Sequence, residues 1–196
     1  MELDIPTPYV QNIVSTSQIV TRNNEVTNID LERIETLLPC TNYDRQRFAA
    51  ITIRIGDPLC TGLLFSSGKL VITGCQNWMQ CVNGALTITH IVQALNPGTD
   101  YCMTNCSIQN MVARVTLPLN ATQHLNIDRM YEELNAFCTY QENMFPGLSY
   151  RNEEVGVVLL CFFSGKIVIT GGKSEESVTN AWQKLWPKVR RYIEEK

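Results

Sequence analysis

The sequence predicts an α+β protein of two repeats, with one curved antiparallel sheet and two long helices covering one of its faces. Two apolar hairpin sequences, Gly62–Gly74 and Val158–Gly171, carry this prediction because both read as strand, Ser-Gly turn, strand and terminal Gly. The second copy lies 97 positions after the first (162 − 65), about half of the 196-residue chain. A long segment with helical spacing of apolar residues follows each hairpin. A unit that occurs only twice favours an internally duplicated pair over a solenoid.

The second hairpin predicts a sheet with two apolar faces, because successive side chains of a strand point to opposite sides. One side holds Val158, Leu160 and Phe162, and the other holds Leu159, Cys161 and Phe163. One face can pack on helices, and the other needs a ligand because a soluble protein rarely leaves such a patch bare. The alternative is a sheet that is covered on both sides.

The first repeat, residues 1–98, begins with a short arm and alternates apolar segments with turn signals. Apolar residues between charges predict a short helix, and Asn96-Pro97-Gly98 predicts the end of a long one. Trp78, Val82, Leu86 and Ile91 are expected on or near one face of that long helix. The predicted elements are the arm at 1–8, a strand at Tyr9–Ile19, a helix at Ile29–Leu38, a polar turn at Thr41–Arg47, a strand at Phe48–Ile55, the hairpin and a helix at Cys75–Leu95.

The second repeat, residues 99–196, restarts the same order, and the two repeats together are expected to form one domain. Its first strand lies 98 positions after that of the first repeat (110 − 12). The predicted elements are strands at Ile108–Val112 and Phe145–Arg151, a short helix at Asp128–Leu134, the hairpin and a helix at Ser174–Glu194. Val178, Trp182, Leu185, Val189 and Tyr192 lie at helical spacing in the last helix, where Pro187 could introduce a kink.

Composition indicates a globular chain, with 44% hydrophobic and 18% charged residues. The net charge of −3 gives no overall basic signal for nucleic acid. No secretory leader and no apolar run of membrane-spanning length are visible, so we expect a nuclear or cytosolic chain without a membrane partner. The eight cysteines form no CxxC pair and only two histidines are present, so we expect reduced thiols, no metal site and no cofactor.

Catalytic chemistry is not expected. The sequence contains no Ser-His-Asp, metal-ligand or phosphate-loop constellation, and two histidines offer little acid–base chemistry. We therefore predict no catalytic residues and a protein that is not an enzyme. The open sheet face suits instead a ligand with approximate two-fold symmetry, and duplex DNA has that symmetry.

Six motifs together resemble the TATA-box-binding protein family, in the order in which that family has them. The similarity extends from about Pro8 to Arg191. The motifs are Gln11–Thr16, Arg47–Ala50, Phe65–Lys69, Gln109–Val112, Phe145–Leu148 and Phe162–Lys166. The resemblance implies a pseudo-two-fold saddle whose long helices lie on the convex face and whose concave sheet lies on the minor groove of DNA.

The resemblance also implies a set of DNA-binding residues. The four matching wedges, which would enter base steps and bend the duplex, are Phe48, Phe65, Phe145 and Phe162. Asn12 and Asn110 match the paired central asparagines, whose amides can donate to the A N3 and T O2 acceptors. The apolar and hydroxyl contacts around them are Val14, Leu63, Val71, Thr73, Val112, Leu160, Val168 and Thr170. The phosphate-facing positions are Arg54, Lys69, Arg151 and Lys166. Core packing of the valines and ordinary surface charge are the competing interpretations.

The chain departs from the family at the surfaces that would bind partners. Cys75–Asn96 contains no Lys, Arg, Asp or Glu, whereas family members carry a basic helix there that transcription factor IIA uses. Gln141, Glu142, Asn143 and Met144 replace a Glu-Pro-Glu-Leu pattern that transcription factor IIB uses. Acidic residues in Asn152–Glu154 stand where the family has a basic segment. These departures are typical of a divergent member, such as one from a virus or a parasite.

We therefore expect a factor that bends A·T-rich promoter DNA and nucleates assembly of the pre-initiation complex. Its expected partners are IIB-like factors, IIA-like factors through altered surfaces, and the RNA polymerase machinery, in the nucleus or at a site of viral transcription. One alternative is a protein-interaction module of the same fold that titrates transcription factors without binding DNA. Another is the substrate-binding domain of a nucleic-acid enzyme, which would need an attached catalytic domain.

Overall fold

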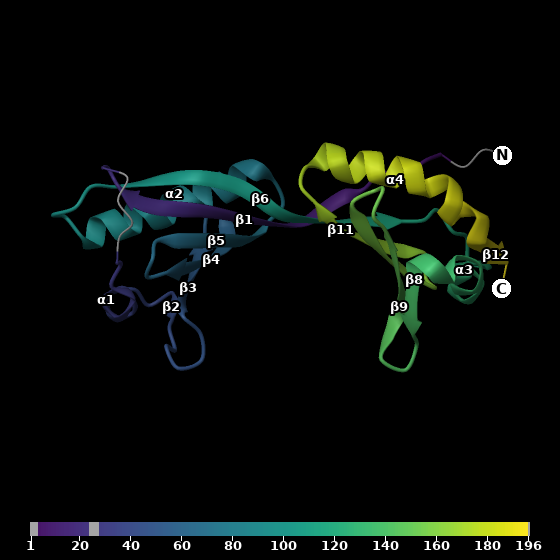
Figure 1. The fold of residues 1–196 in the computed structure, drawn as a ribbon, viewed down its shortest axis with the longest axis horizontal. Coiled ribbons are helices and arrows are strands. Elements are labelled where there is room, and N and C mark those ends of the chain that lie inside the picture. Colours follow the sequence, from purple (N-terminus) through teal and green to yellow (C-terminus); the bar gives the residue numbers. More distant parts are fainter. Residues whose placement is uncertain (1–3, 24–27, 196) are drawn as a thin grey trace. The chain divides into compact units, whose positions relative to one another are not determined.

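The computed structural model describes residues 4–23 and 28–195, and these form four α-helices, two 3-10 helices and twelve strands (Figure 1). Residues 1–3 of the predicted arm lie outside the described residues. The elements up to and including the first long helix are β1 (Tyr9–Thr21), α1 (Leu31–Leu37), β2 (Thr41–Asn42), β3 (Ala50–Gly56), β4 (Leu59–Phe65), β5 (Lys69–Cys75) and α2 (Trp78–Leu95). The rest are β6 (Tyr101–Thr116), β7 (Gln123–Leu125), α3 (Ile127–Leu134), η1 (Asn135–Phe137), β8 (Cys138–Gln141), β9 (Phe145–Asn152), β10 (Val157–Phe162), β11 (Lys166–Gly172), α4 (Glu175–Val189), η2 (Arg190–Tyr192) and β12 (Ile193–Glu195).

Ten strands make one sheet in the order β2-β3-β4-β5-β1-β6-β11-β10-β9-β8. The pairs from β2 to β1 and from β6 to β8 are antiparallel, which confirms the predicted α+β class and antiparallel sheet. The two predicted hairpins are β4–β5 and β10–β11. Their turns depend on Gly68 and Gly165, which adopt φ values of +79° and +75° that side chains other than glycine rarely accept.

The chain divides into two compact units. The first unit is Asn12–Gln109, and the second unit holds the chain from Asn110 onward together with the segment before Asn12. The predicted repeats, 1–98 and 99–196, differ from these units at their edges because β1 and β6 each run from one unit into the other. In the second unit the indole Nε1 of Trp182 donates to the carbonyl of Pro6 at 2.7 Å, which ties the N-terminal segment to α4.

In the first unit, α2 packs on β4 and β5 through small residues. Its buried residues are Cys81, Gly84, Ala85, Ile88, Thr89 and Val92. A Cβ atom at Gly84 would lie 2.6 Å from Cys60 Sγ, so the glycine allows a close approach of helix and strand. The prediction that Trp78, Val82, Leu86 and Ile91 form the apolar face of this helix was therefore wrong. Trp78 and Leu86 are 38% and 37% exposed and lie at the margins of the contact with the sheet.

The long helix begins later than predicted, at Trp78 instead of Cys75. The side chain of Asn77 caps it by accepting from the backbone N–H of Gln80 at 2.9 Å. Cys75 remains in β5, where it pairs with Ile13 of β1 and is fully buried. Pairing with β1 thus keeps Cys75 in a strand, although the local spacing of apolar residues had placed it in the helix.

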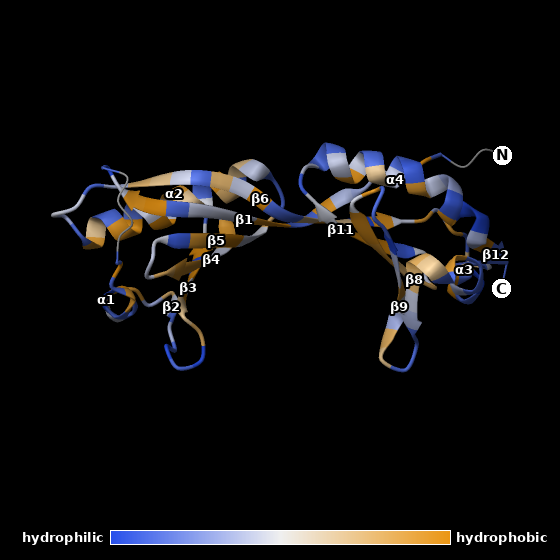
Figure 2. Cartoon of the chain, in the orientation of Figure 1, coloured by the Kyte–Doolittle hydropathy of each residue, from blue (hydrophilic) through white to orange (hydrophobic). Residues whose placement is uncertain are grey.

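In the second unit, α4 buries the apolar face that the sequence predicted: Val178, Trp182, Leu185 and Val189 are at most 2% exposed. Hydrophobic and hydrophilic residues both occur along the whole length of this helix (Figure 2). The helix passes through Pro187 and ends at Val189, so the prediction that it reaches Glu194 was wrong. The final residues instead form β12, which pairs with β7 at Glu194 and His124. Such a partner, distant in sequence, leaves no local signal.

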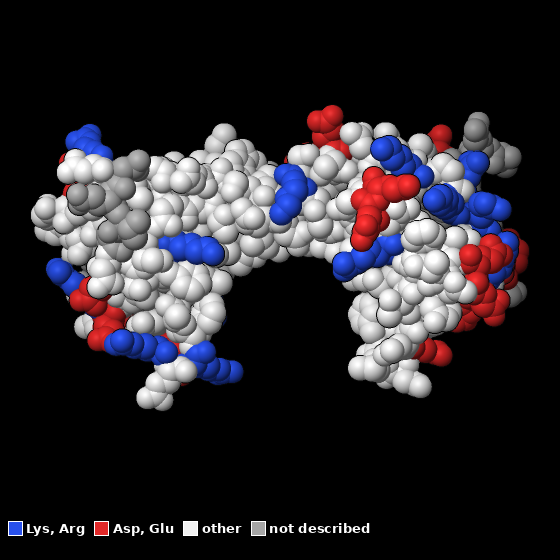
Figure 3. All heavy atoms as spheres, in the orientation of Figure 1, with Lys and Arg blue, Asp and Glu red and all other residues white. Residues whose placement is uncertain are grey.

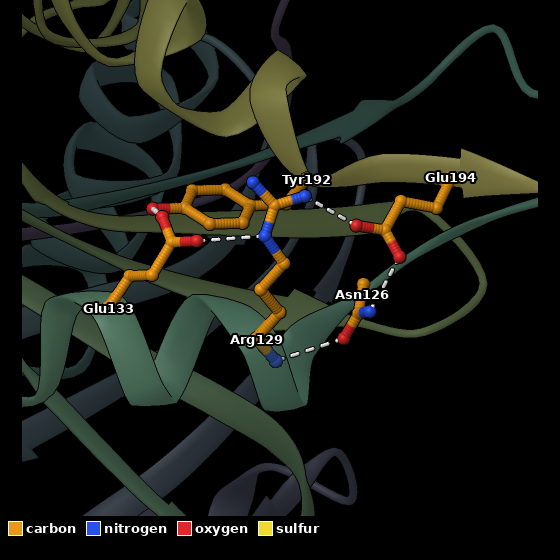
Figure 4. A network of polar contacts seen from close by, with 5 residues as sticks. All are labelled: Asn126, Arg129, Glu133, Tyr192 and Glu194. Atoms are coloured by element: carbon orange, nitrogen blue, oxygen red, sulfur yellow. Dashed lines mark hydrogen bonds and ion pairs between the residues drawn. The ribbon is translucent and has the colours of Figure 1, made fainter.

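Five side chains, which we term the C-terminal clasp, join α3 to the end of the chain: Asn126, Arg129, Glu133, Tyr192 and Glu194 (Figure 4). The Arg129 guanidinium donates to Glu133 at 2.8 Å and to Glu194 at 2.5 Å, and it lies 5.5 Å from the centre of the Tyr192 ring. Asn126 Nδ2 donates to Glu194 at 2.7 Å, and the Tyr192 hydroxyl donates to Glu133 at 3.0 Å. Hydrogen bonds from Arg129 and Tyr192 lower the pKa of Glu133, and bonds from Asn126 and Arg129 lower that of Glu194. The clasp fixes α3, which packs on β8 and β9.

Three short strands escaped the sequence prediction. β2 lies inside the segment predicted as a polar turn, and β7 and β8 lie where no strand was expected. β6 spans Tyr101–Thr116 and is much longer than the predicted Ile108–Val112. Among the described residues, no helix has the length and apolar character required to cross a membrane.

Candidate nucleic-acid interface

Each unit has a sheet face turned away from its long helix, which we term the open face. In β10 the alternation is as predicted: Leu159 and Cys161 are fully buried, while Val158, Leu160 and Phe162 are half-buried on the open face. Phe163 was expected beside Leu159, but it lies after the end of β10, is 52% exposed and stacks on His124 at a ring separation of 4.5 Å. The open face of each unit is therefore apolar and uncovered by the described residues.

The four phenylalanines form one pair in each unit. The ring centroids of Phe48 and Phe65 lie 5.9 Å apart with an interplanar angle of 67°, and those of Phe145 and Phe162 lie 5.6 Å apart at 70°. Phe48 and Phe145 are 48% and 43% exposed, although side chains of this size are usually buried. The second pair is crowded around a glycine, because a Cβ atom at Gly147 would lie 2.7 Å from the Phe145 ring.

The two asparagines are anchored in the same way in the two units. Asn12 Oδ1 accepts from the backbone N–H of Gly74 at 2.8 Å, and Asn110 Oδ1 accepts from that of Gly171 at 2.8 Å. Because a backbone N–H can only donate, the amide oxygen of each asparagine must point toward the glycine and the amide nitrogen must point away from it. The Nδ2 group of Asn12 has no partner among the described residues, and that of Asn110 lies 3.3 Å from the hydroxyl of Thr170. Each asparagine thus turns its donor end away from its anchor.

The predicted apolar and hydroxyl contacts surround these groups as cross-strand pairs. Leu63 pairs with Val71 in the first unit, as Leu160 pairs with Val168 in the second. All eight positions are half-buried: Val14, Leu63, Val71, Thr73, Val112, Leu160, Val168 and Thr170. The hydroxyl of Thr73 lies 3.4 Å from Asn12 Oδ1, and that of Thr170 lies 3.4 Å from Asn110 Oδ1. The structure therefore brings together in each unit the residues that the resemblance selected.

The four predicted phosphate-facing residues are exposed: Arg54, Lys69, Arg151 and Lys166. In the described parts of the chain, no carboxylate lies within ion-pair distance of any of them. Arg151 also lines a hollow of about 230 Å³ together with Glu153 and Gly171, so acidic charge lies close to this position. The open faces carry cations that are available to an anionic ligand.

The residues predicted to bind a IIB-like partner form the turn between β8 and β9. The backbone N–H of Met144 donates to the carbonyl of Gln141 at 2.9 Å, and Met144 is 82% exposed. Glu142 and Asn143 occupy the exposed tip. The corresponding loop of the first unit, between β2 and β3, has basic atoms at its tip, and the β8–β9 turn has acidic ones (Figure 3).

One charged residue of the open face was missed by the sequence analysis. Arg114 of β6 is exposed two positions beyond Val112 and pairs with Val168 of β11. Strand alternation from Val112 would have placed it there, but the family motif ends at that valine. Its counterpart in the first unit, 98 positions earlier, is Thr16 (114 − 98), which pairs with Val71.

Half of the thiols of the chain are buried apolar groups. All eight cysteines are free, and Cys60, Cys75, Cys81 and Cys161 are buried. Burial raises the pKa of Cys161 to about 12 and that of Cys138 to about 11, so both thiols are protonated at neutral pH. Within the described residues, no three His, Cys, Asp or Glu side chains come together as metal ligands.

The fold and its two matching sets of side chains define a class of internally duplicated α+β proteins with an uncovered sheet face in each unit. The sequence model of one such family, transcription factor TFIID or TATA-binding protein, matches residues 7–95 and 105–192. The chain belongs to this family of transcription factors.

Individual relatives agree with this assignment. The TATA-box-binding protein of Caenorhabditis elegans is 36% identical over 193 residues, which are 97% of this chain and 53% of that protein. The TATA-box-binding protein 1 of Triticum aestivum is 35% identical over 94% of this chain and 74% of its own length. The structure of Methanococcus jannaschii TBP superposes with a TM-score of 0.76 at 31% identity, covering 95% of this chain and 99% of that one. The chain thus spans about half the length of the nematode relative.

Proposed function

We propose that this protein binds the minor groove of A·T-rich promoter DNA, bends the duplex and nucleates assembly of the pre-initiation complex, without enzymatic activity. The observation that carries the proposal is the duplicated set on the open faces, with one exposed phenylalanine pair and one anchored asparagine in each unit. Both open faces contact one duplex in this proposal, as the saddle of the family implies.

The phenylalanines act as wedges. An apolar ring inserted between base steps unstacks them and kinks the duplex, which costs about a few kcal/mol per step and is offset by the additional contacts that a bent duplex makes. The exposed rings of Phe48 and Phe145 each have a second ring within 6 Å to support them. Exposed cations at Lys69 and Lys166 contact phosphates beside these steps.

The asparagines supply the preference for A·T pairs. A·T pairs present only the acceptors A N3 and T O2 in the minor groove, whereas a guanine adds its N2 amino donor. The Oδ1 atoms of Asn12 and Asn110 are occupied by backbone N–H groups, so the amide ends that remain are donors. A guanine amino group would meet these donors directly, which disfavours G·C pairs at the centre of the site.

The expected partners follow from exposed surfaces outside the open faces. A IIB-like factor would bind the turn of Gln141, Glu142, Asn143 and Met144, and the RNA polymerase machinery would assemble through it. A IIA-like factor would have to bind α2, which carries no charged side chain. Charge complementarity sets association rates and partner choice, so an acidic IIA surface should bind poorly. The protein would act in the nucleus, or at a site of viral transcription.

The decisive experiment is a gel shift on an A·T-rich duplex and a G·C-rich duplex, combined with energy transfer between labelled duplex ends. We expect tight binding and a shortened end-to-end distance on the A·T-rich duplex only. A small molecule that occupies the A·T minor groove should compete. Binding without a change in end-to-end distance would overturn the wedge role, and equal binding to both duplexes would overturn the role of the asparagines.

The second candidate function is a module that titrates transcription factors without binding DNA. The net charge of −3 and the uncharged α2 favour it. The absence of a gel shift on both duplexes, together with capture of a IIB-like factor, would support this candidate. A supershift with factors IIA and IIB from a conventional eukaryote tests the partner surfaces separately. A IIA supershift as tight as that of a basic family member would contradict the proposed change of partner.

A further inference from the structure

We propose that Arg114 reads the minor groove in the half of the site that the second unit binds, and so gives the protein one preferred orientation on DNA. This inference rests on the proposed function. Arg114 lies outside the motifs that match the family. The first support is the direction of its side chain from β6. Met111, Ala113 and Val115 point from β6 into the core and are at most 1% exposed, so Val112 and Arg114 point to the open face.

The register of the sheet places Arg114 among the residues of the proposed interface. It pairs with Val168, and Val168 pairs in turn with Leu160 of β10. The next pair of β6 and β11 on the same face is Thr116 with Lys166, a proposed phosphate contact. Arg114 therefore lies on the open face between the apolar contact Val112 and the Thr116–Lys166 pair. From this place a long side chain can reach the groove.

The guanidinium of Arg114 is available for a ligand. The side chain is exposed, and no carboxylate lies within ion-pair distance in the residues that the structure describes. A guanidinium has five N–H donors and no acceptor. Such a group complements the A N3 and T O2 acceptors and meets an additional donor where a guanine is present. Narrow A·T minor grooves also have an enhanced negative potential that attracts arginine.

The first unit offers different chemistry at the equivalent place. Thr16 pairs with Val71 as Arg114 pairs with Val168, but its hydroxyl is short and already accepts from Gln109 Nε2 at 2.8 Å. The phenylalanine pairs, the anchored asparagines and the Leu–Val pairs are the same in the two open faces, so this position makes one half of the interface more demanding than the other. On an A·T-rich site that is nearly symmetric, the unit that carries Arg114 should occupy the half with the longer uninterrupted A·T run.

The test compares the wild-type protein with three variants: Arg114→Thr, Arg114→Lys and Thr16→Arg. Each is titrated on duplexes in which one half-site at a time contains A·T, inosine·C or G·C pairs. Inosine·C lacks the guanine amino group, so its minor groove resembles that of A·T. Because Arg114 is exposed, its two variants should keep the wild-type melting temperature. The melting temperature of all three variants is measured first, because Thr16→Arg removes the hydroxyl that accepts from Gln109.

We expect the wild type to lose affinity with G·C pairs more strongly in one half-site and to accept inosine·C there. Arg114→Thr should reduce affinity on A·T and inosine·C about tenfold, the range for one good base contact, and should equalise the two halves. Thr16→Arg should impose the same discrimination on the other half. A photocrosslinking residue at Glu142, on the β8–β9 turn, should mark one end of the duplex in the wild type and both ends in Arg114→Thr.

Three results would overturn the inference. A uniform loss on all three duplexes for Arg114→Thr, restored by Arg114→Lys, would assign the residue to a phosphate contact. Unchanged affinity and orientation in Arg114→Thr would remove any role for it, while the proposed function would stand on the wild-type binding. Failure of the wild type to bind any duplex would overturn the proposed function and this inference with it.

Discussion

The two units agree on their open faces and differ in how they pack their long helices. Each open face has a phenylalanine pair, an anchored asparagine, a Leu–Val cross-strand pair and exposed cations. Beneath them, α2 packs through small residues such as Gly84, whereas α4 buries Trp182 and Trp186. The matching side chains of the open faces are half-buried or exposed, so the core beneath the helices does not account for them. In the proposed function, a ligand shared by the two faces explains this agreement.

The outer surfaces of the units also differ. α2 carries no charged side chain, whereas α4 carries Glu175, Glu176, Lys184 and Lys188. Among the described residues of the first unit, no counterpart of the C-terminal clasp is found, and the chain there continues from α2 into β6. Surfaces that contact no common ligand are free to differ, so these are the places where partner choice and local stability are expected to be specific to one unit.

The largest expected effect tests whether the two phenylalanine pairs are equivalent. Replacing Phe145 and Phe162 with Ala, or Phe48 and Phe65 with Ala, should each remove one of two kinks and reduce the DNA bend by about half. Energy transfer between labelled duplex ends measures this angle. Phe163→Ala is the matched control, because Phe163 is 52% exposed but lies beyond β10. An unchanged bend in either double variant would show that that pair is not a wedge.

The second prediction concerns the two asparagines. Asn12→Ala and Asn110→Ala should each weaken binding to A·T-rich DNA by about 1–3 kcal/mol and relax discrimination at the central base pairs. Asn→Asp should be more harmful, because the carboxylate keeps an acceptor for the Gly74 or Gly171 N–H but presents no donor to the bases. Binding constants on A·T and G·C central steps measure both effects. Discrimination that survives both alanine variants would assign specificity elsewhere.

A smaller effect is expected from the cations. Each neutralised phosphate contributes about 0.9 to the slope of log affinity against log salt, so Lys69→Gln and Lys166→Gln should each make the slope shallower by that amount. Lys184→Gln on the outside of α4 is the control and should leave the slope unchanged. The wild type itself should show a shallower slope than a basic family member titrated side by side. An equal or steeper slope would contradict the reduced number of phosphate contacts.

The smallest expected effect is on the stability of the clasp. Arg129→Gln should lower the melting temperature more than Arg45→Gln, because the Arg45–Glu32 pair is longer, at 3.7 Å, and both of its side chains are at least 72% exposed. The pKa values of Glu133 and Glu194 are lowered below the ordinary value of 4.5. Their contribution is therefore complete above pH 4.5 and is lost as the pH falls through the lowered values.

Thermal melts of the wild type and Arg129→Gln over this pH range give the comparison. The two curves should converge in acid. If their separation stayed constant as the pH fell, the clasp would not depend on the two carboxylates, and packing of the arginine stem on Tyr192 would explain the difference.

The amino-acid sequence by itself determined the duplication, the class of fold and the composition of the open faces. Period-two alternation in Val158–Phe162 separated open from buried side chains correctly, because a strand leaves each residue only two directions. The turns at Gly68 and Gly165 were also visible, since a positive φ demands glycine. The apolar stripe of α4 was equally clear, because large residues at helical spacing need a core.

Only the tertiary structure decided the features that depend on partners distant in the chain. β12 forms because β7 lies beside it, and Cys75 stays in a strand because Ile13 pairs with it. The donor ends of Asn12 and Asn110 are turned outward because the N–H groups of Gly74 and Gly171, about 60 residues away, hold their oxygens. Arg114 became a candidate only when strand register placed it beside Val168. The local sequence determines which side chains point to each side of a strand or helix. The pairing between distant segments determines which of those side chains are buried and which lie on the open face.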